Sequence, residues 1–185
     1  MNEEKQLPIS TQETEEKRFQ LNPNPQKHYQ MTITVENAPG SFEKLETSIS
    51  YEAPNCTYQF AGLSAATAHP DKNIPLQFKK IADNKYRGDF YVDAMKDEDY
   101  YGQGVCKWDF RRLIALFSAT NSEQNTQFSA SISPEDLQTK KIEINHLKED
   151  YPETRGVKGD LSSGINKEAF KPEEYFTFII ELEEL

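Results

Sequence analysis

The feature that most constrains this chain is a set of short runs in which apolar and polar residues alternate. In residues 28–36, HYQMTITVE, every second side chain is large and apolar: Tyr29, Met31, Ile33 and Val35. A period of two places successive side chains on opposite faces of a β-strand. This run therefore predicts a first strand with one buried face.

Similar runs recur and predict about seven more strands. They cover residues 42–53, 74–81, 85–93, 105–117, 126–132, 140–145 and 175–185. Residues 82–84 separate two of these runs as a short turn, which indicates a β-hairpin, and Gly88 is expected to mark a bulge. Ser133 and Pro134, followed by two acids, predict the start of a single helical turn.

Two stretches lack the alternation and are expected to be long loops. Residues 57–73 are rich in Ala, Ser and Thr, and we expect Phe60 and Leu63 to be tucked beneath them. Within residues 146–173, Pro152 and three glycines, Gly156, Gly159 and Gly164, disfavour regular structure. Loops of this length in a compact domain are usually functional or disordered.

One stretch, DEDYYGQGVCKWDFRRLIALFSAT at residues 97–120, holds the only Trp of the chain, two residues after one of its two Cys. If the strand includes this pair, Cys106 and Trp108 point to the same face. A Cys and a Trp that enter one core are typical of the pin in an immunoglobulin-type sandwich. Trp108 is thus expected in the core.

The predicted fold is all-β, an immunoglobulin-like antiparallel β-sandwich of about eight strands with two long loops and at most one short helical turn. A length of 185 residues suits one domain. We place this domain at residues 28–185. Residues 1–27 are polar, contain three prolines and show no apolar periodicity, so we expect a disordered tether.

The charge balance restricts the partners. The formal net charge is -10, from 31 acidic and 21 basic residues. Proteins that bind nucleic acids need basic clusters, and no run of five Lys or Arg is present, so nucleic acid is not expected as a partner. An anionic membrane surface is disfavoured for the same reason. A basic protein partner fits an acidic protein better.

The two cysteines point to an oxidising compartment. Cys56 and Cys106 are expected to form a disulfide, although two unrelated buried thiols remain the alternative. A bridge between positions 50 apart would stabilise the fold by about 4 kcal/mol in the loop-entropy treatment. The polar start resembles a mature secreted chain, and we hypothesise that Met1 stands in place of a lipidated Cys.

No catalytic or metal motif stands out, and we expect neither an enzyme nor a cofactor. There is no GxSxG nucleophile elbow, and the three histidines, His28, His69 and His146, are far apart in the sequence. Two enzyme alternatives remain: a catalytic triad whose residues come together only in the fold, and a pair of catalytic carboxylates. Neither cysteine has a near neighbour of the kind that zinc sites use.

The acidic run and the tyrosines beside it are the main candidates for binding. Asp97, Glu98 and Asp99 form a solvated turn, a partner contact or, less simply, part of a calcium site. Tyr100 and Tyr101 are suited to anchor a protein partner or to stack on sugars, unless one of them packs under the domain. In the second loop, Tyr151 and Arg155 are further partner-binding candidates.

The run YVDAMKDEDYYGQGVCKW resembles a motif of small periplasmic lipoproteins that are encoded beside type VI secretion phospholipase effectors. The matching positions span about a tenth of the chain: Asp97, Glu98, Asp99, Tyr100, Tyr101, Gly102, Gly104, Val105, Cys106 and Trp108. The resemblance implies an immunity protein, anchored by lipid to the outer membrane and located in the periplasm. Its partner would be a cognate phospholipase toxin, which it binds and blocks.

The interface is expected at one end of the sandwich, in loops 97–104 and 146–173. An envelope- or carbohydrate-binding accessory module on the same fold is the alternative function, and a hydrolase is the third. Fold alone does not separate these classes, because sandwiches host many functions.

Overall fold

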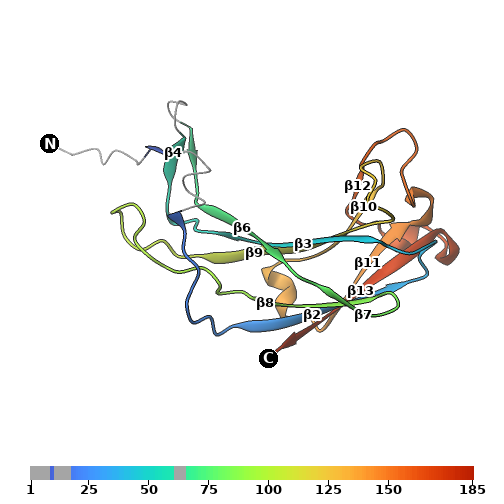
Figure 1. Cartoon of the computed structure of the whole chain (residues 1–185), viewed down its shortest axis with the longest axis horizontal. Helices are drawn as coiled ribbons and strands as arrows, with labels where there is room; N and C mark the ends of the chain where they lie inside the picture. The colour runs from blue at the N-terminus through green and yellow to red at the C-terminus, as the bar shows by residue number, and fades with distance from the viewer. Residues whose placement is uncertain (1–8, 11–17, 61–65) are drawn as a thin grey trace.

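A computed structural model describes residues 9–10, 18–60 and 66–185 of the chain. Two five-stranded β-sheets face one another across a shared apolar core, so the predicted all-β sandwich is confirmed (Figure 1). A small three-stranded sheet around β4 stands at one end of the sandwich. No helix in these residues is long and apolar enough to cross a membrane.

One layer, here called the β9 sheet, has the strand order β12-β10-β9-β3-β6. Its strands are β3 (Lys44–Glu52), β6 (Asp71–Leu76), β9 (Asp109–Ser118), β10 (Gln127–Ile132) and β12 (Leu161–Ser162). The other layer, the β2 sheet, has the order β11-β13-β2-β8-β7. Its strands are β2 (His28–Glu36), β7 (Lys79–Ala82), β8 (Lys85–Tyr91), β11 (Lys141–Leu147) and β13 (Tyr175–Glu184).

The remaining elements are short. The small sheet contains β1 (Ile9–Ser10), β4 (Tyr58–Phe60) and β5 (Thr67–Ala68). Four 3₁₀ helices lie in the connections: η1 (Pro134–Gln138), η2 (Lys148–Asp150), η3 (Lys167–Ala169) and η4 (Pro172–Glu174). The predicted helical turn is η1, in which the Asp136 carboxylate accepts hydrogen bonds from the backbone N–H and the hydroxyl of Ser133.

The period-two pattern explains how the layers pack. β2 has the bounds predicted from the sequence, and its apolar side is buried. The last strand, β13, pairs with β2 in antiparallel register, so that Ile180 lies opposite Ile33 and Phe178 opposite Val35. Each of these four side chains is at most 4 % exposed, and burying one contributes roughly 1.5–3 kcal/mol. The last strand of the chain thus pairs with the first strand of the two large sheets.

The predicted hairpin at residues 74–93 is only partly correct. β7 and β8 form it around a turn at Asn84, which adopts a left-handed φ of 57°. Residues 74–76, however, belong to β6 in the opposite sheet, so the chain changes layers at residues 77–78. Gly88 marks no bulge: a Cβ there would lie 2.1 Å from the Phe78 ring, and the glycine leaves room for that ring.

Two other expectations need amendment. From Phe19 onward the stretch expected to be a tether packs on the domain, and Phe19 itself is only 7 % exposed in the main core. Residues 57–73 contain β4 and β5 in place of a plain connection. The expectation for the side chains of Phe60 and Leu63 falls outside the described part of the chain.

Candidate protein-binding surface

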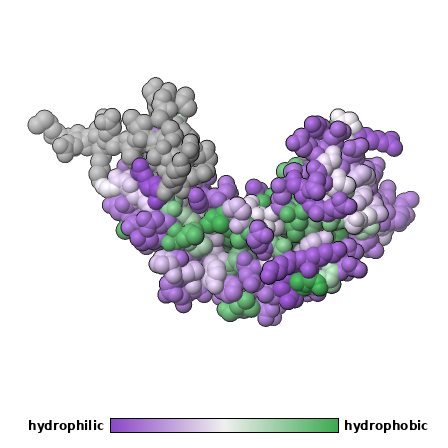
Figure 2. Space-filling model, in the orientation of Figure 1, coloured by the Kyte–Doolittle hydropathy of each residue, from purple (hydrophilic) through white to green (hydrophobic). Residues whose placement is uncertain are grey.

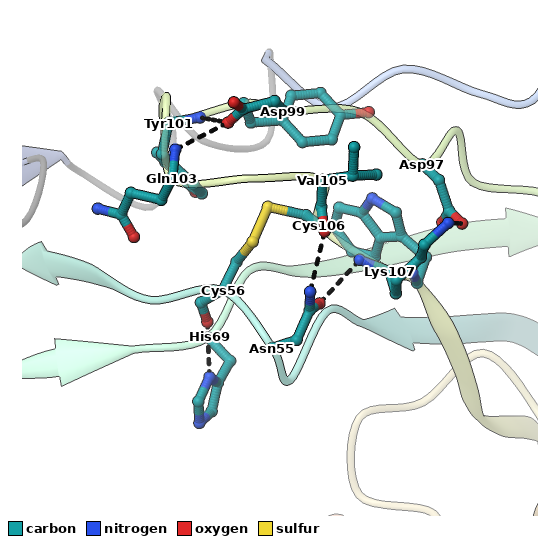
Figure 3. The surroundings of a disulfide bond; sticks show 12 residues. Asn55, Cys56, His69, Asp97, Asp99, Tyr101, Gln103, Val105, Cys106 and Lys107 are labelled. Carbon is teal, nitrogen blue, oxygen red and sulfur yellow. Dashed lines mark hydrogen bonds and ion pairs between the residues drawn. A yellow bond between two sulfur atoms is a disulfide. The ribbon is translucent and has the colours of Figure 1, made fainter.

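The disulfide is the best-defined feature predicted from the sequence. Cys56 and Cys106 are bonded with an S–S distance of 2.01 Å and a Cα–Cα distance of 5.5 Å (Figure 3). They form a small buried cluster with Ala53, at the end of the sandwich. The bridge joins the residue just beyond β3 to a residue just before β9, and these two strands are neighbours in one sheet.

The expected immunoglobulin-type pin is therefore wrong, although the bridge is present. Trp108 and Cys106 precede β9, which begins at Asp109, and the bridge does not cross between layers. Trp108 is only partly buried and packs edge-on against Phe19, with 4.8 Å between ring centroids. Its indole N–H is buried and, within the described residues, has no hydrogen-bond acceptor.

The segment before β9, residues 105–108, is held mainly by hydrogen bonds from side chains and not by pairing with a neighbouring strand. The Asn55 amide donates to Val105 O at 2.9 Å and accepts from the Lys107 N–H at 2.8 Å (Figure 3). The Asp97 carboxylate accepts from the Trp108 N–H and from the Lys107 ammonium, both at 3.0 Å. Asp97, predicted as a partner contact, thus has a structural role in this loop.

The other two acids of the run are also engaged within their own turn. Glu98 pairs with Lys96 at 3.0 Å, and its carbonyl accepts from the Cys106 N–H. Partial desolvation alone would raise the pKa of Asp99, but backbone N–H groups of residues 101–104 outweigh it and lower that pKa. The described residues contain no group of three or more Asp, Glu, His or Cys arranged to hold a metal ion.

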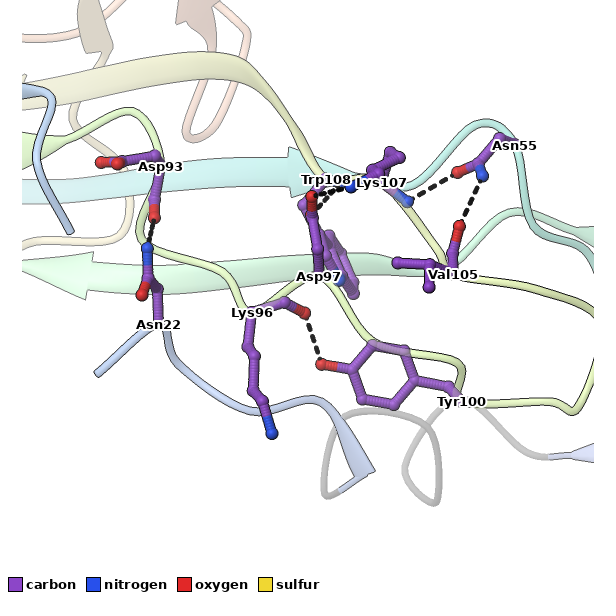
Figure 4. Close-up of polar contacts among 9 residues, drawn as sticks. All are labelled: Asn22, Asn55, Asp93, Lys96, Asp97, Tyr100, Val105, Lys107 and Trp108. Atoms are coloured by element: carbon purple, nitrogen blue, oxygen red, sulfur yellow. Dashed lines mark hydrogen bonds and ion pairs between the residues drawn. The ribbon is translucent and has the colours of Figure 1, made fainter. Parts of the chain in front are cut away.

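Both tyrosines of the motif are half-buried. The Tyr100 hydroxyl donates to Lys96 O at 2.7 Å, and its ring lies edge-on to Phe19 and Trp108 (Figure 4). Tyr101 stacks against Tyr58 with 6.3 Å between ring centroids. An alanine at either position would therefore remove packing contacts as well as any partner contact.

The two loops expected at one end of the sandwich lie at opposite ends. Residues 97–106 lead into the start of β9, whereas the segment after η2 binds near the start of β10, which pairs with the end of β9. Ten residues of β9 separate these ends, or about 33 Å. The structure thus groups residues 97–101 together and places Tyr151 and Arg155 far from them (Figure 1).

Tyr151 has a packing role, whereas Arg155 is exposed. The Tyr151 hydroxyl donates to Ser41 O at 2.7 Å, and its ring stacks on Phe128. Arg155 lies in the loop that follows and stands in solvent. Of this predicted pair, only Arg155 is classed as exposed, and Tyr151 is partly buried.

The three histidines lie in three separate environments. His28 stacks on Tyr91 where β2 begins and β8 ends, and His69 Nδ1 lies 2.7 Å from Cys56 O. His146 is fully buried between the sheets, with Nδ1 2.7 Å from Ser162 Oγ and Nε2 3.0 Å from Ser129 O. Burial lowers the pKa of His146 to about 4, which makes it a weak base near neutral pH.

A surface that the sequence reasoning missed lies on the outer face of the β9 sheet. Leu113, Ala115 and Phe117 face the core, so Ile114 and Leu116 point outward, and both are partly exposed. The neighbours of Ile114 on this face are small, because it lies opposite Ser48 and Ser131. Leu116 lies opposite Ser129 on one side and the charged Glu46 on the other.

The parallel pairing of β12 with β10 adds Leu161, 51 % exposed, to the same face as Gln127. Figure 2 shows this side as a hollow above β3, β6 and β9, with hydrophobic residues along its floor and a hydrophilic wall around β12. The signal in the sequence was the unbroken apolar run at residues 113–117, which leaves apolar side chains on both faces of a strand.

The outer face of the β9 sheet thus carries apolar side chains near its centre, with serines and Glu46 beside them, on a chain in which 28 % of residues are charged. Exposed apolar side chains that gather on one face are a feature of interaction sites. Comparisons with protein families, with curated proteins and with solved structures find no match to this chain.

Proposed function

We propose that this protein is an exported inhibitor that acts by binding: an immunity protein that covers a cognate type VI secretion phospholipase toxin in the periplasm. The observation that carries the proposal is the hollowed outer face of the β9 sheet, where Leu161 is exposed and Ile114 and Leu116 are partly exposed. The family named in the proposal rests on the resemblance of residues 97–108.

Interface size favours this face over the end loops. A standard complex buries about 800 Å² on each partner, a patch roughly 30 Å across. Such a patch covers the floor of the hollow along β9 and reaches one or both ends, where loops 97–104 and 153–160 lie. Residues 97–101 and Arg155 are then rim contacts, and Ile114 and Leu116 are central.

Chemistry and compartment are consistent with this proposal. The Cys56–Cys106 bridge suits an oxidising compartment such as the periplasm. The net charge of -10 favours encounter with a basic partner surface. Fully buried apolar contacts at the centre of an interface supply most of its binding energy, and charges at the rim chiefly set the rate of association.

The test pairs two equivalent isoleucines. Ile114→Glu alters the outer face of the β9 sheet, and Ile179→Glu makes the same change on the outer face of the β2 sheet, where Ile179 is also partly exposed. Each variant is produced with the lipase-like toxin encoded beside it, and toxin inhibition is measured. We expect Ile114→Glu to weaken binding at least 30-fold, about 2 kcal/mol, and Ile179→Glu to leave it unchanged.

Equal activity of both variants would refute the assignment of this face. Glycan binding by the purified protein without any protein partner would favour the envelope- or carbohydrate-binding module, and turnover of a lipid or ester would favour a hydrolase. Thermal unfolding of both variants serves as the control for folding.

A further inference from the structure

Residues 18–22 lie along the domain and form one antiparallel β-bridge with it, between Leu21 and Met95. Two backbone bonds make this bridge: Asn22 N–H donates to Ala94 O at 2.8 Å, and Lys96 N–H donates to Gln20 O at 2.9 Å. The Asn22 side chain adds a bond to Asp93 O at 2.9 Å (Figure 4). Main-chain bonds of this type are how an extended peptide adds to a strand edge.

A side-chain slot accompanies the bridge. Phe19 enters between the rings of Tyr100 and Trp108, with centroid distances of 5.2 and 4.8 Å, and is 7 % exposed. Next to it, the Arg18 guanidinium lies over the Tyr101 ring at 5.2 Å and donates to Tyr100 O at 3.3 Å. The slot therefore selects a basic residue followed by an aromatic one.

The segment is held at few points. Leu21 is 60 % exposed, and residues 23–27, with two prolines, are mostly solvent-exposed before β2 begins. Prolines have no backbone N–H for a ladder. After Asn22, the attachment consists of the Asp93 carboxylate, which accepts from the N–H groups of Gln26 and Lys27, and of Lys27 O, which accepts from Val92 N–H. Before that point, it rests on Phe19 and on the bonds of residues 18–22. Segments with so few buried contacts open locally without global unfolding.

We propose that the 93–96 edge and the Tyr100–Trp108 slot form a peptide-binding groove, which the chain's own residues 18–22 fill in this structure. In trans, the groove binds an extended peptide that carries a basic residue followed by an aromatic one. The groove shares Tyr100 and Tyr101 with the rim of the interface proposed above, but it does not include Ile114 or Leu116 at the centre of that interface.

The experiment uses Trp108, the only Trp of the chain, as its reporter. In the full chain, Phe19→Ala empties the slot, and we expect the Trp108 emission to shift to longer wavelength. A synthetic peptide with the sequence of residues 18–27, RFQLNPNPQK, is then titrated, and should restore the original emission saturably. The control peptide carries Ala in place of Phe19 and should bind at least tenfold more weakly.

The wild-type chain provides the second measurement. Because its own segment competes, the labelled native peptide should bind wild type at least tenfold more weakly than it binds Phe19→Ala, as observed by fluorescence anisotropy. Equal binding of the two peptides, or no saturable binding to Phe19→Ala, would overturn the proposal. If circular dichroism shows that Phe19→Ala is unfolded, binding of the native peptide to wild type is measured at millimolar concentration instead. Binding that is lost with the alanine-substituted peptide supports the groove, and the absence of such binding refutes it.

Discussion

At the end of the sandwich where β9 begins, a covalent bond holds the loops, whereas at the end where β9 finishes a buried histidine does so. Cys56 and Cys106 tie the first end, assisted by the side chains of Asn55 and Asp97. At the second end, His146 on β11 contacts Ser129 on β10 and Ser162 on β12. The two ends should therefore respond to different treatments, the first to reductant and the second to acid.

The difference follows from what each segment can bury. Residues 97–107 contain few aliphatic side chains and turn on Gly102 and Gly104, both with positive φ, so little apolar burial opposes their unfolding. The segment after β11 instead gains hydrogen bonds: Thr154 N–H donates to Thr126 Oγ1 at 2.9 Å, and Tyr151 bonds Ser41 O. A loop without a core of its own needs either a cross-link or a polar network.

Removal of the disulfide should have the largest effect. The Cys56→Ser/Cys106→Ser double variant frees a loop of 50 residues in the unfolded chain, and we expect the free energy of unfolding to fall by about 4 kcal/mol. Denaturant unfolding in oxidising buffer measures it. Wild type in reductant should match the variant, and a loss below about 1 kcal/mol would show that the side-chain contacts alone suffice.

Acid should have the next largest effect on the free energy of unfolding, and it should act at the end of the sandwich where β9 finishes. The pKa of His146 is lowered to about 4 in the folded state from an ordinary value of 6.5, so the folded chain favours the neutral imidazole. The stabilisation is complete above pH 6.5 and is lost as pH falls toward 4, by about 3 kcal/mol in total.

His146→Gln keeps a polar side chain without this titration. The unfolding free energy of wild type should therefore fall more steeply between pH 6.5 and 4 than that of the variant. Asp150 also has a pKa shifted by burial, upward, but it is present in both proteins and cancels in the difference. Parallel pH profiles would contradict the role given to His146.

The smallest expected change in stability comes from removing one tyrosine hydroxyl at each end of the sandwich. Tyr151→Phe removes the bond to Ser41 O, and Tyr100→Phe removes the bond to Lys96 O, both 2.7 Å long. We expect about 1 kcal/mol for Tyr151 and less for Tyr100, because the disulfide restrains the loop around Tyr100. Thermal unfolding of both variants measures the effects, and a larger loss for Tyr100→Phe would reverse the comparison.

Strands with one buried face could be predicted from the sequence almost to the residue. β2 and β13 alternate strictly, and burial of one face fixes both their extent and their register. The disulfide was also predictable, since the chain has only two cysteines. The position of the disulfide before β9 could not be predicted. The spacing of Cys106 and Trp108 suits a strand, and it does not show that the backbone between them is bound by side chains of Asn55 and Asp97 in place of a neighbouring strand.

Three parts of the candidate sites had no readable signal. The end of the sandwich at which a loop lies depends on the number of strands between it and the other loops. The alternation of apolar residues did not reveal that β6 and β7 belong to different layers, so this number could not be predicted. Phe19 has only Leu21 as an apolar neighbour in a polar stretch, which is too short a pattern to identify its burial. Ile114 and Leu116 were readable in principle, yet an apolar run is equally typical of a strand buried on both faces.

The crossing at residues 77–78 has a consequence for chain length. Packed sheets lie about 10 Å apart. The three Cα steps from Leu76 to Lys79 span at most about 11 Å. The link is nearly taut, so it sets the thickness of the domain at this edge, and a relative lacking one residue here would require a thinner core.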